Sequence, residues 1–354
     1  MQNALKPVCR YALIVARTVE QEWNAFWYTP VDPTLLGLLR LLTGLMLIYT
    51  HAVWGLALDD FFGRTSWLSP SLVRAIESQQ YMYSFWSWVP HQWMWPVYAL
   101  SLVVFVCFTL GIWTRITSVL ALFAAISYAN RVPAALFGLD QINIMLTLYL
   151  AIGPSGRCLS LDYWLARRRV GSPGLVPAPS VTANVAQRLI QVHMCVIYLF
   201  AGISKLQGPS WWSGEAMWRA FANLEYQSLD MTWLAWHPWL INVMSHVSVA
   251  WEIAFCVLIW KPLWRPPMLA IAVLLHIGIG ACLGMWTFGL IMLVGCASFL
   301  PNEAVRQLAG RLIERRRAVT YGEQRCEEKS RRDAGRHGRA EAALAMASAN
   351  GVAQ

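Results

Sequence analysis

Long, almost uncharged apolar segments recur along this chain and constrain its fold more than any other feature. A helix needs about 20 mostly apolar residues to cross a bilayer, and every backbone polar group inside the hydrocarbon must be paired. The segments are therefore predicted to be transmembrane helices. The fourth segment is short. The last two segments are almost continuous, so the alternative for these two is a re-entrant pair of helices. The eight segments are Thr34–Ala57, Val97–Trp113, Ile116–Phe137, Gln141–Gly153, Arg188–Leu206, Leu240–Trp260, Pro266–Leu283 and Met285–Leu300.

Composition agrees with a membrane protein. Of the 354 residues, 57% are hydrophobic and only 13% are charged, whereas a soluble domain averages about 25% charged residues. The predicted fold class is an all-α, polytopic helical bundle of about eight transmembrane helices. The net charge of +9 is local, because residues 301–354 hold 11 of the 28 Lys and Arg residues. The expected partner is therefore the lipid bilayer, and nucleic acid is not expected.

Two common features of secreted and metal-binding chains are not expected here. The eight cysteines form no CxxC pair and have no metal-ligand spacing to a histidine, so neither a disulfide framework nor a metal site is predicted. The segment Met1–Glu22 carries charges and lacks an apolar core followed by a small-residue cleavage site. A cleavable signal peptide is therefore not predicted.

The distribution of basic residues predicts the orientation. Cytoplasmic connections carry an excess of Lys and Arg. With the N-terminus inside, the inner segments hold 21 Lys and Arg residues, and the outer segments hold only Arg64, Arg74 and Arg219. An even number of spans then places both termini in the cytoplasm.

The sequence divides into three regions. Residues 1–30 include an amphipathic stretch, Arg10–Tyr28, which is predicted to lie along the cytoplasmic interface. Residues 31–300 form the transmembrane region, with a Pro-rich linker inside the connection Pro154–Gln187. Residues 301–354 are predicted to be a basic, disordered cytoplasmic tail that an anionic membrane surface attracts.

Tryptophan is concentrated in two outer connections. Asp59–Pro96 and Gln207–Trp239 hold 11 of the 20 tryptophans. One interpretation is an aromatic belt at the lipid headgroups. The other is an aromatic vestibule for an apolar ligand that enters from the outer leaflet. The two interpretations are compatible.

Ionisable residues at membrane depth are costly and mark candidate functional sites. Lys205 ends the fifth segment at the predicted outer face. A lysine there is unusual for this chain, because its basic residues are concentrated on the predicted inner side. Its amine is predicted to be screened from water by neighbouring tryptophans, which favours a role as a base. Glu252 lies near the middle of the sixth segment and His276 midway along the seventh, so the preferred pairing is Glu252–His276. His246 lies on another face from Glu252. A snorkelling Lys205 and a structural His276 are the plainer alternatives.

Other polar residues cluster around the third and fourth segments. Arg131 is near the outer end of the third segment, and Asp140 and Gln141 begin the fourth at the same depth. An Arg131–Asp140 pair is therefore plausible. Arg40, in the inner part of the first segment, is interpreted as a paired or snorkelling residue.

Three sequence patterns resemble the HTTM membrane domain, which is shared with vitamin K-dependent gamma-glutamyl carboxylases. The most specific is Ala-Gly-Ile-Ser-Lys-Leu over residues 201–206, followed by Trp-Trp-Ser-Gly over 211–214. It resembles the carboxylase segment that carries the proposed catalytic lysine. Glu252 and His276, followed by Phe288, Met292 and Leu293, form the second pattern. Leu-Ser-Leu-Asp at 159–162 forms the third. The resemblance covers roughly residues 30–300.

The resemblance implies chemistry on a reduced, vitamin K-like quinone. In such chemistry a lysine deprotonates the reduced quinone, oxygen adds, and a strong base forms in a dry pocket. That base removes a glutamate γ-proton, carbon dioxide adds, and the quinone leaves as an epoxide. The implied catalytic residues are Lys205, Glu252 and His276. The implied substrate-binding residues are Trp211, Trp212, Gly214, Arg131, Gln141, Asn143 and His246.

Two departures separate this chain from the carboxylases. The carboxylases need a histidine in the region that matches the start of the fourth segment. This chain has Gln141 and Asn143 there, and their side chains can donate hydrogen bonds but carry no charge. The carboxylases also have a large additional domain after the membrane part, whereas this sequence continues into a short charged tail. Carboxylation of a propeptide-bearing protein is therefore not the expected activity.

Two functions follow as hypotheses. One is a membrane enzyme acting on a quinone or another apolar small molecule, with Lys205 as base at the outer face of a bacterial inner membrane. The other is a non-catalytic membrane factor for export, maturation or assembly of a partner protein. A transporter has less support, because no inverted repeat or pair of broken helices is visible in the sequence.

Overall fold

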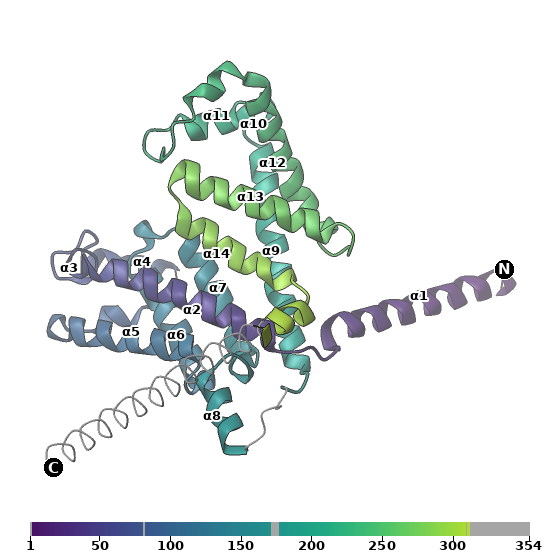
Figure 1. Ribbon diagram of the computed structural model, residues 1–354, viewed down its shortest axis with the longest axis horizontal. Helices are drawn as coiled ribbons and strands as arrows, with labels where there is room; N and C mark the ends of the chain where they lie inside the picture. Colours follow the sequence, from purple (N-terminus) through teal and green to yellow (C-terminus); the bar gives the residue numbers. More distant parts are fainter. Residues whose placement is uncertain (1, 81, 171–176, 309, 312–354) are drawn as a thin grey trace, which may run out of the picture. The chain divides into compact units, whose positions relative to one another are not determined.

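The computed structural model describes residues 2–80, 82–170, 177–308 and 310–311 (Figure 1). In this part of the chain the residues form helices joined by turns, with an isolated β-bridge between Val31 and Ser180. The all-α class is thereby confirmed. The α-helices are α1 (Gln2–Tyr28), α2 (Thr34–Gly55), α3 (Leu58–Phe62), α4 (Pro70–Gln80), α5 (Met94–Leu110), α6 (Thr114–Arg131), α7 (Gly138–Ile152), α8 (Leu161–Val170), α9 (Val181–Leu206), α10 (Pro209–Trp212), α11 (Ala216–Phe221), α12 (Pro238–Leu258), α13 (Arg265–Leu283) and α14 (Trp286–Cys296). Short 3-10 helices cover Phe85–Trp88, His91–Trp93, Pro133–Ala135, Ser155–Arg157, Thr232–Trp236 and Ala297–Phe299.

Each of the eight predicted segments coincides with one helix, in the order α2, α5, α6, α7, α9, α12, α13 and α14. Among the described residues, five helical segments are long and apolar enough to cross a membrane, or six if the bent pair Trp286–Phe299 and Asn302–Leu308 counts as one span. Helix α7 is apolar but shorter, and α6 carries an arginine near each end. The structure therefore supports five or six spans, and the count of eight and the orientation remain predictions.

The chain divides into two compact units, residues 1–302 and 303–354. The first contains all the helices named above. The predicted amphipathic segment is helical as part of α1, whereas its position at an interface is untested. Most of the tail, residues 312–354, lies outside the described residues.

Polar side chains on α9 fix it against its neighbours. The Nε2 atoms of Gln187 and Gln191 both donate to the carbonyl oxygen of Ser298, at 3.0 and 2.7 Å. Asn184 Nδ2 donates to the carbonyl oxygen of Phe26 at 2.8 Å, just before α1 ends. These amides supply partners for carbonyl groups at helix ends, which the helices leave unpaired.

Tyr128 of α6 organises the aromatic residues of the first outer connection. Phe62 and Trp86 pack edge-on against its ring, with centroids 5.2 and 5.1 Å away. Trp86 is buried, whereas Trp88 and Trp236 are more than four-fifths exposed. The connections thus combine a buried aromatic cluster with exposed tryptophans of the kind that an aromatic belt uses.

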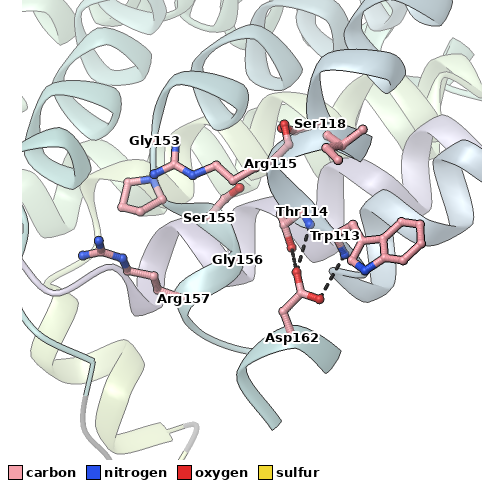
Figure 2. Close-up of a pocket in the computed structure, with 11 residues that line it drawn as sticks. Trp113, Thr114, Arg115, Ser118, Gly153, Ser155, Gly156, Arg157 and Asp162 are labelled. Atoms are coloured by element: carbon pink, nitrogen blue, oxygen red, sulfur yellow. Dashed lines mark hydrogen bonds between the residues drawn. The ribbon is translucent and has the colours of Figure 1, made fainter. Parts of the chain in front are cut away.

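The Leu-Ser-Leu-Asp pattern caps a helix. Asp162, at the start of α8, accepts hydrogen bonds from the backbone amides of Trp113 and Thr114 at 3.0 and 2.9 Å, and from Thr114 Oγ1 at 2.9 Å (Figure 2). It thereby pairs amide groups at the N-terminus of α6, which would otherwise lack partners.

Arg40 is fully buried nearby and donates to the carbonyl oxygen of Leu159. This bond satisfies Nη2 of Arg40, whereas its Nε and Nη1 atoms lack hydrogen-bond partners among the described residues.

A cavity of about 490 Å³ lies beside this cap, and Asp162 lines it together with Arg115 and Arg157 (Figure 2). The predicted topology places it on the cytoplasmic side. Asp162 therefore both closes a helix end and forms part of the cavity wall.

Substituting Asp162 with alanine is expected to lower the free energy of unfolding by about 1–2 kcal/mol, because three bonds to the start of α6 are lost. Thermal unfolding of the purified protein in detergent measures the effect. Asp60→Ala, an exposed acidic residue of α3, is the matched control. Equal unfolding temperatures for the two variants would contradict the capping role.

Candidate functional site

Lys205 and Glu252 form a close ion pair between the C-terminal end of α9 and α12. The lysine Nζ lies 2.8 Å from Oε1 and 2.7 Å from Oε2 of the carboxylate. The lysine side chain is 24% exposed and the glutamate side chain 9%. Two opposite charges at this depth compensate one another, which reduces the cost of burying either.

Gly202 explains how α9 and α12 come close enough for this pair. Residues 202 and 205 are three apart and so share one face of α9. A Cβ atom on Gly202 would lie 2.7 Å from Cγ1 of Ile253 and 3.2 Å from Cβ of Glu252. The missing side chain therefore lets α12 pack directly on α9 and brings Glu252 opposite Lys205.

Tyr198 lies on the same face of α9 as Lys205, two helical turns closer to the start of the helix. Its hydroxyl lies 2.7 Å from Nε2 of His276 on α13 and 3.2 Å from Sγ of Cys296 on α14. The predicted Glu252–His276 pairing was therefore wrong: Glu252 binds Lys205, and His276 binds Tyr198. A tyrosine hydroxyl can both donate and accept, so it satisfies the imidazole in either tautomer.

Two buried polar atoms near Tyr198 lack hydrogen-bond partners among the described residues. They are Nδ1 of His276 and Nε1 of Trp251, and both side chains are almost fully buried. The Trp251 ring packs edge-on against Tyr198, with centroids 5.0 Å apart. Buried polar atoms are normally paired, so these two are available to a water molecule or a polar group of a ligand.

The Trp-Trp-Ser-Gly pattern lies beside the ion pair. The Trp211 ring centroid is 5.4 Å from Nζ of Lys205, within the range of a cation–π contact. Trp212 is 65% exposed, and its Nε1 donates to the carbonyl oxygen of Leu206. Gly214 has φ +77°, a conformation that favours glycine, and its carbonyl accepts from Ser245. Trp211 is thus the residue of this pattern that contacts the candidate base.

The structure does not bring the other predicted site residues to Lys205. His246 is exposed, and its Nδ1 is 2.9 Å from the carbonyl oxygen of Asn242. Gln141 is exposed at the start of α7. Asn143 is buried and borders a water-sized cavity of about 10 Å³ that His51 also lines.

The plausible Arg131–Asp140 pair does not form. Arg131 donates to Oγ of Ser66 at 3.0 Å and to the carbonyl oxygen of Leu68 at 3.3 Å. The carboxylate of Asp140 accepts from the backbone amide of Phe137 and caps α7. The N-terminal amides of α7 attract this carboxylate locally, which explains the difference.

Sequence reasoning missed Tyr198, although a signal was present. Tyr198 precedes Lys205 by seven residues, two helical turns, so the two side chains lie on one face of α9. The Lys205–Glu252 pair had no comparable local signal, because its members lie on different helices. Lys205, Glu252 and His276 are absent from the lining of five cavities found in the described chain.

Replacing Gly202 with valine is expected to separate α9 from α12 and cost about 1–3 kcal/mol of stability through overpacking. Gly278→Val on α13 is the matched control, since a Cβ there meets nothing within 4 Å. Thermal unfolding of both variants in the same detergent measures the difference. A similar loss in both would show that valine in a helix, and not close packing, is responsible.

Comparison with known proteins agrees with this architecture. The family model described as the HTTM domain matches residues 28–303. No curated protein and no solved structure matches the chain. Together with its long apolar helices, the match over most of the sequence identifies a multi-pass integral membrane protein. The chain belongs to the HTTM-domain family.

Proposed function

We propose that this chain is a membrane enzyme in which the Lys205–Glu252 pair accepts a proton from an apolar substrate supplied by the bilayer. The observation that carries the proposal is the pair itself. Its amine contacts both carboxylate oxygens and still has a 24% exposed side chain. A buried carboxylate thus supports a basic group that a substrate can reach.

The residues around the pair fit the polar end of a reduced quinone. Such a molecule, when bound, supplies an acidic hydroxyl group and two electrons. In the ion pair Nζ of Lys205 carries its proton. That proton first passes to the Glu252 carboxylate, and the neutral amine then takes the hydroxyl proton of the quinone. The Trp211 ring, 5.4 Å from Nζ, offers an aromatic face to the substrate.

The proposed chemistry is this proton transfer. The remaining carboxylase steps need a dry, enclosed site, whereas Lys205 is absent from the lining of five cavities found in the described chain. They also need the histidine that Gln141 and Asn143 replace.

One observation favours a second function, that of a non-catalytic membrane factor. The pair joins α9 to α12 through two short hydrogen bonds, so it can serve purely as a clamp. In that case the exposed outer connections would contact a partner protein, and no chemistry would occur at Lys205.

Lys205→Met and Lys205→Arg should both abolish turnover of a reduced quinone by the protein in lipid nanodiscs. Loss of a general base is expected to slow the reaction by at least about 100-fold. Oxygen consumption, which follows deprotonation of the reduced quinone, is the measurement, and Lys261→Met, an exposed lysine after α12, is the control. Absence of turnover in the folded wild type would reject the quinone enzyme and favour the membrane factor.

Glu252→Gln should destabilise the protein by about 1–3 kcal/mol, because it leaves the Lys205 ammonium group without its carboxylate. The double variant Lys205→Met, Glu252→Leu should recover most of that stability but no turnover. Thermal unfolding and quinone turnover are measured on the same samples. A stable double variant with wild-type turnover would mean that the pair is only a clamp.

A further inference from the structure

The outer arginines of this chain have an unusual distribution. By the predicted topology, the outer connections hold just three of the 28 Lys and Arg residues: Arg64, Arg74 and Arg219. Arg64 and Arg74 line the same cavity. Because Lys and Arg are rare on this side by that topology, two arginines at one cavity are informative. Neither has an ion-pair partner in the described part of the chain.

The cavity has a volume of about 140 Å³ and lies between the first outer connection and the end of α6. Three of its lining residues are arginines, Arg64, Arg74 and Arg131, and His91 also lines it. No aspartate or glutamate is among its described lining residues. The charged side chains among the described lining residues are therefore all basic.

The buried wall of the cavity is fixed in place. Arg131 is 3% exposed, and Ser66 and the carbonyl group of Leu68 hold its guanidinium group. Its Cζ atom lies 6.0 Å from the centre of the Phe62 ring. A rigid, buried guanidinium group is better prepared to bind an anion than a flexible surface lysine is, because less side-chain freedom is lost on binding.

Trp86 provides an independent sign of a missing ligand. Its side chain is 6% exposed and lines the cavity, yet its indole Nε1 has no acceptor among the described residues. Indole nitrogen is a donor only, and a buried donor without an acceptor is costly. An anion in the cavity would supply that acceptor.

We propose that this cavity binds an oxyanion, a carboxylate or phosphate group, at the outer face of the membrane. Guanidinium groups present paired N–H donors that match the two oxygens of such a group. Arg64 and Arg74 are exposed and meet the ligand at the surface, whereas Arg131 and Trp86 hold it from the buried side. The residues come from the first outer connection and α6, so this site is separate from the α9–α12 pair.

The carboxylate or phosphate group can belong to a small soluble anion or to the headgroup of an anionic lipid. Inorganic phosphate and acetate are the soluble probes, titrated by calorimetry into the protein in phosphatidylcholine nanodiscs. Phosphatidylglycerol nanodiscs form the lipid arm, in which native mass spectrometry counts the lipids that remain bound.

Arg74→Ala should weaken binding about tenfold, as expected for losing a charge-assisted hydrogen bond. Trp86→Phe, which keeps an aromatic ring and removes only the donor, should weaken it severalfold. Arg219→Ala should change nothing, because Arg219 lies outside the cavity and pairs with Glu215 at 3.4 Å.

Binding of phosphate or acetate with this variant pattern would support a soluble anion. Retained phosphatidylglycerol that Arg74→Ala releases and Arg219→Ala does not would support the lipid source. Absence of both signals in the folded wild type would overturn the proposal. An equal loss in Arg74→Ala and Arg219→Ala would also overturn it, since general surface charge would then explain binding.

Discussion

The arrangement of this bundle depends on one constraint: polar groups at membrane depth must find partners within the protein, because lipid offers none. The side chains on α9 show how the chain meets it. Gln187 and Gln191 bind the carbonyl group of Ser298, Tyr198 binds His276, and Lys205 binds Glu252. One helix therefore carries polar contacts at several depths, and each contact fixes its rotation against a different neighbour.

Close packing makes the last of these contacts possible. Gly202 removes the steric barrier between α9 and α12, and the ion pair then forms one turn further along. The same helix face continues to Tyr198, whose hydroxyl reaches α13 and α14. A proposed base, its carboxylate and a tyrosine–histidine pair are thus aligned along one face of one helix, without an irregular segment between them.

Sequence patterns predicted where the helices lie along the chain, but they did not predict which side chains contact one another between helices. Apolar length located all eight segments, because a run such as Leu240–Trp260 has one plausible structure in a membrane. The partner of Glu252 was mispredicted because depth alone was considered, and depth does not say which face of α12 points at which helix. Asp140 was likewise assigned to Arg131, although the nearest amides, at the start of its own helix, were the stronger attraction. The unfavourable position of Lys205 was visible in the sequence, whereas its partner required the tertiary fold.

The cap that Asp162 places on α6 has a consequence for biosynthesis. The carboxylate lies 48 residues after Thr114, the amide that it binds, with the whole of α7 between them. At about 5–20 residues per second, the ribosome completes α6 several seconds before it supplies the residue that closes the start of that helix. Helices α6 and α7 are therefore synthesised while this end is still open, and the emergence of α8 supplies the missing acceptor.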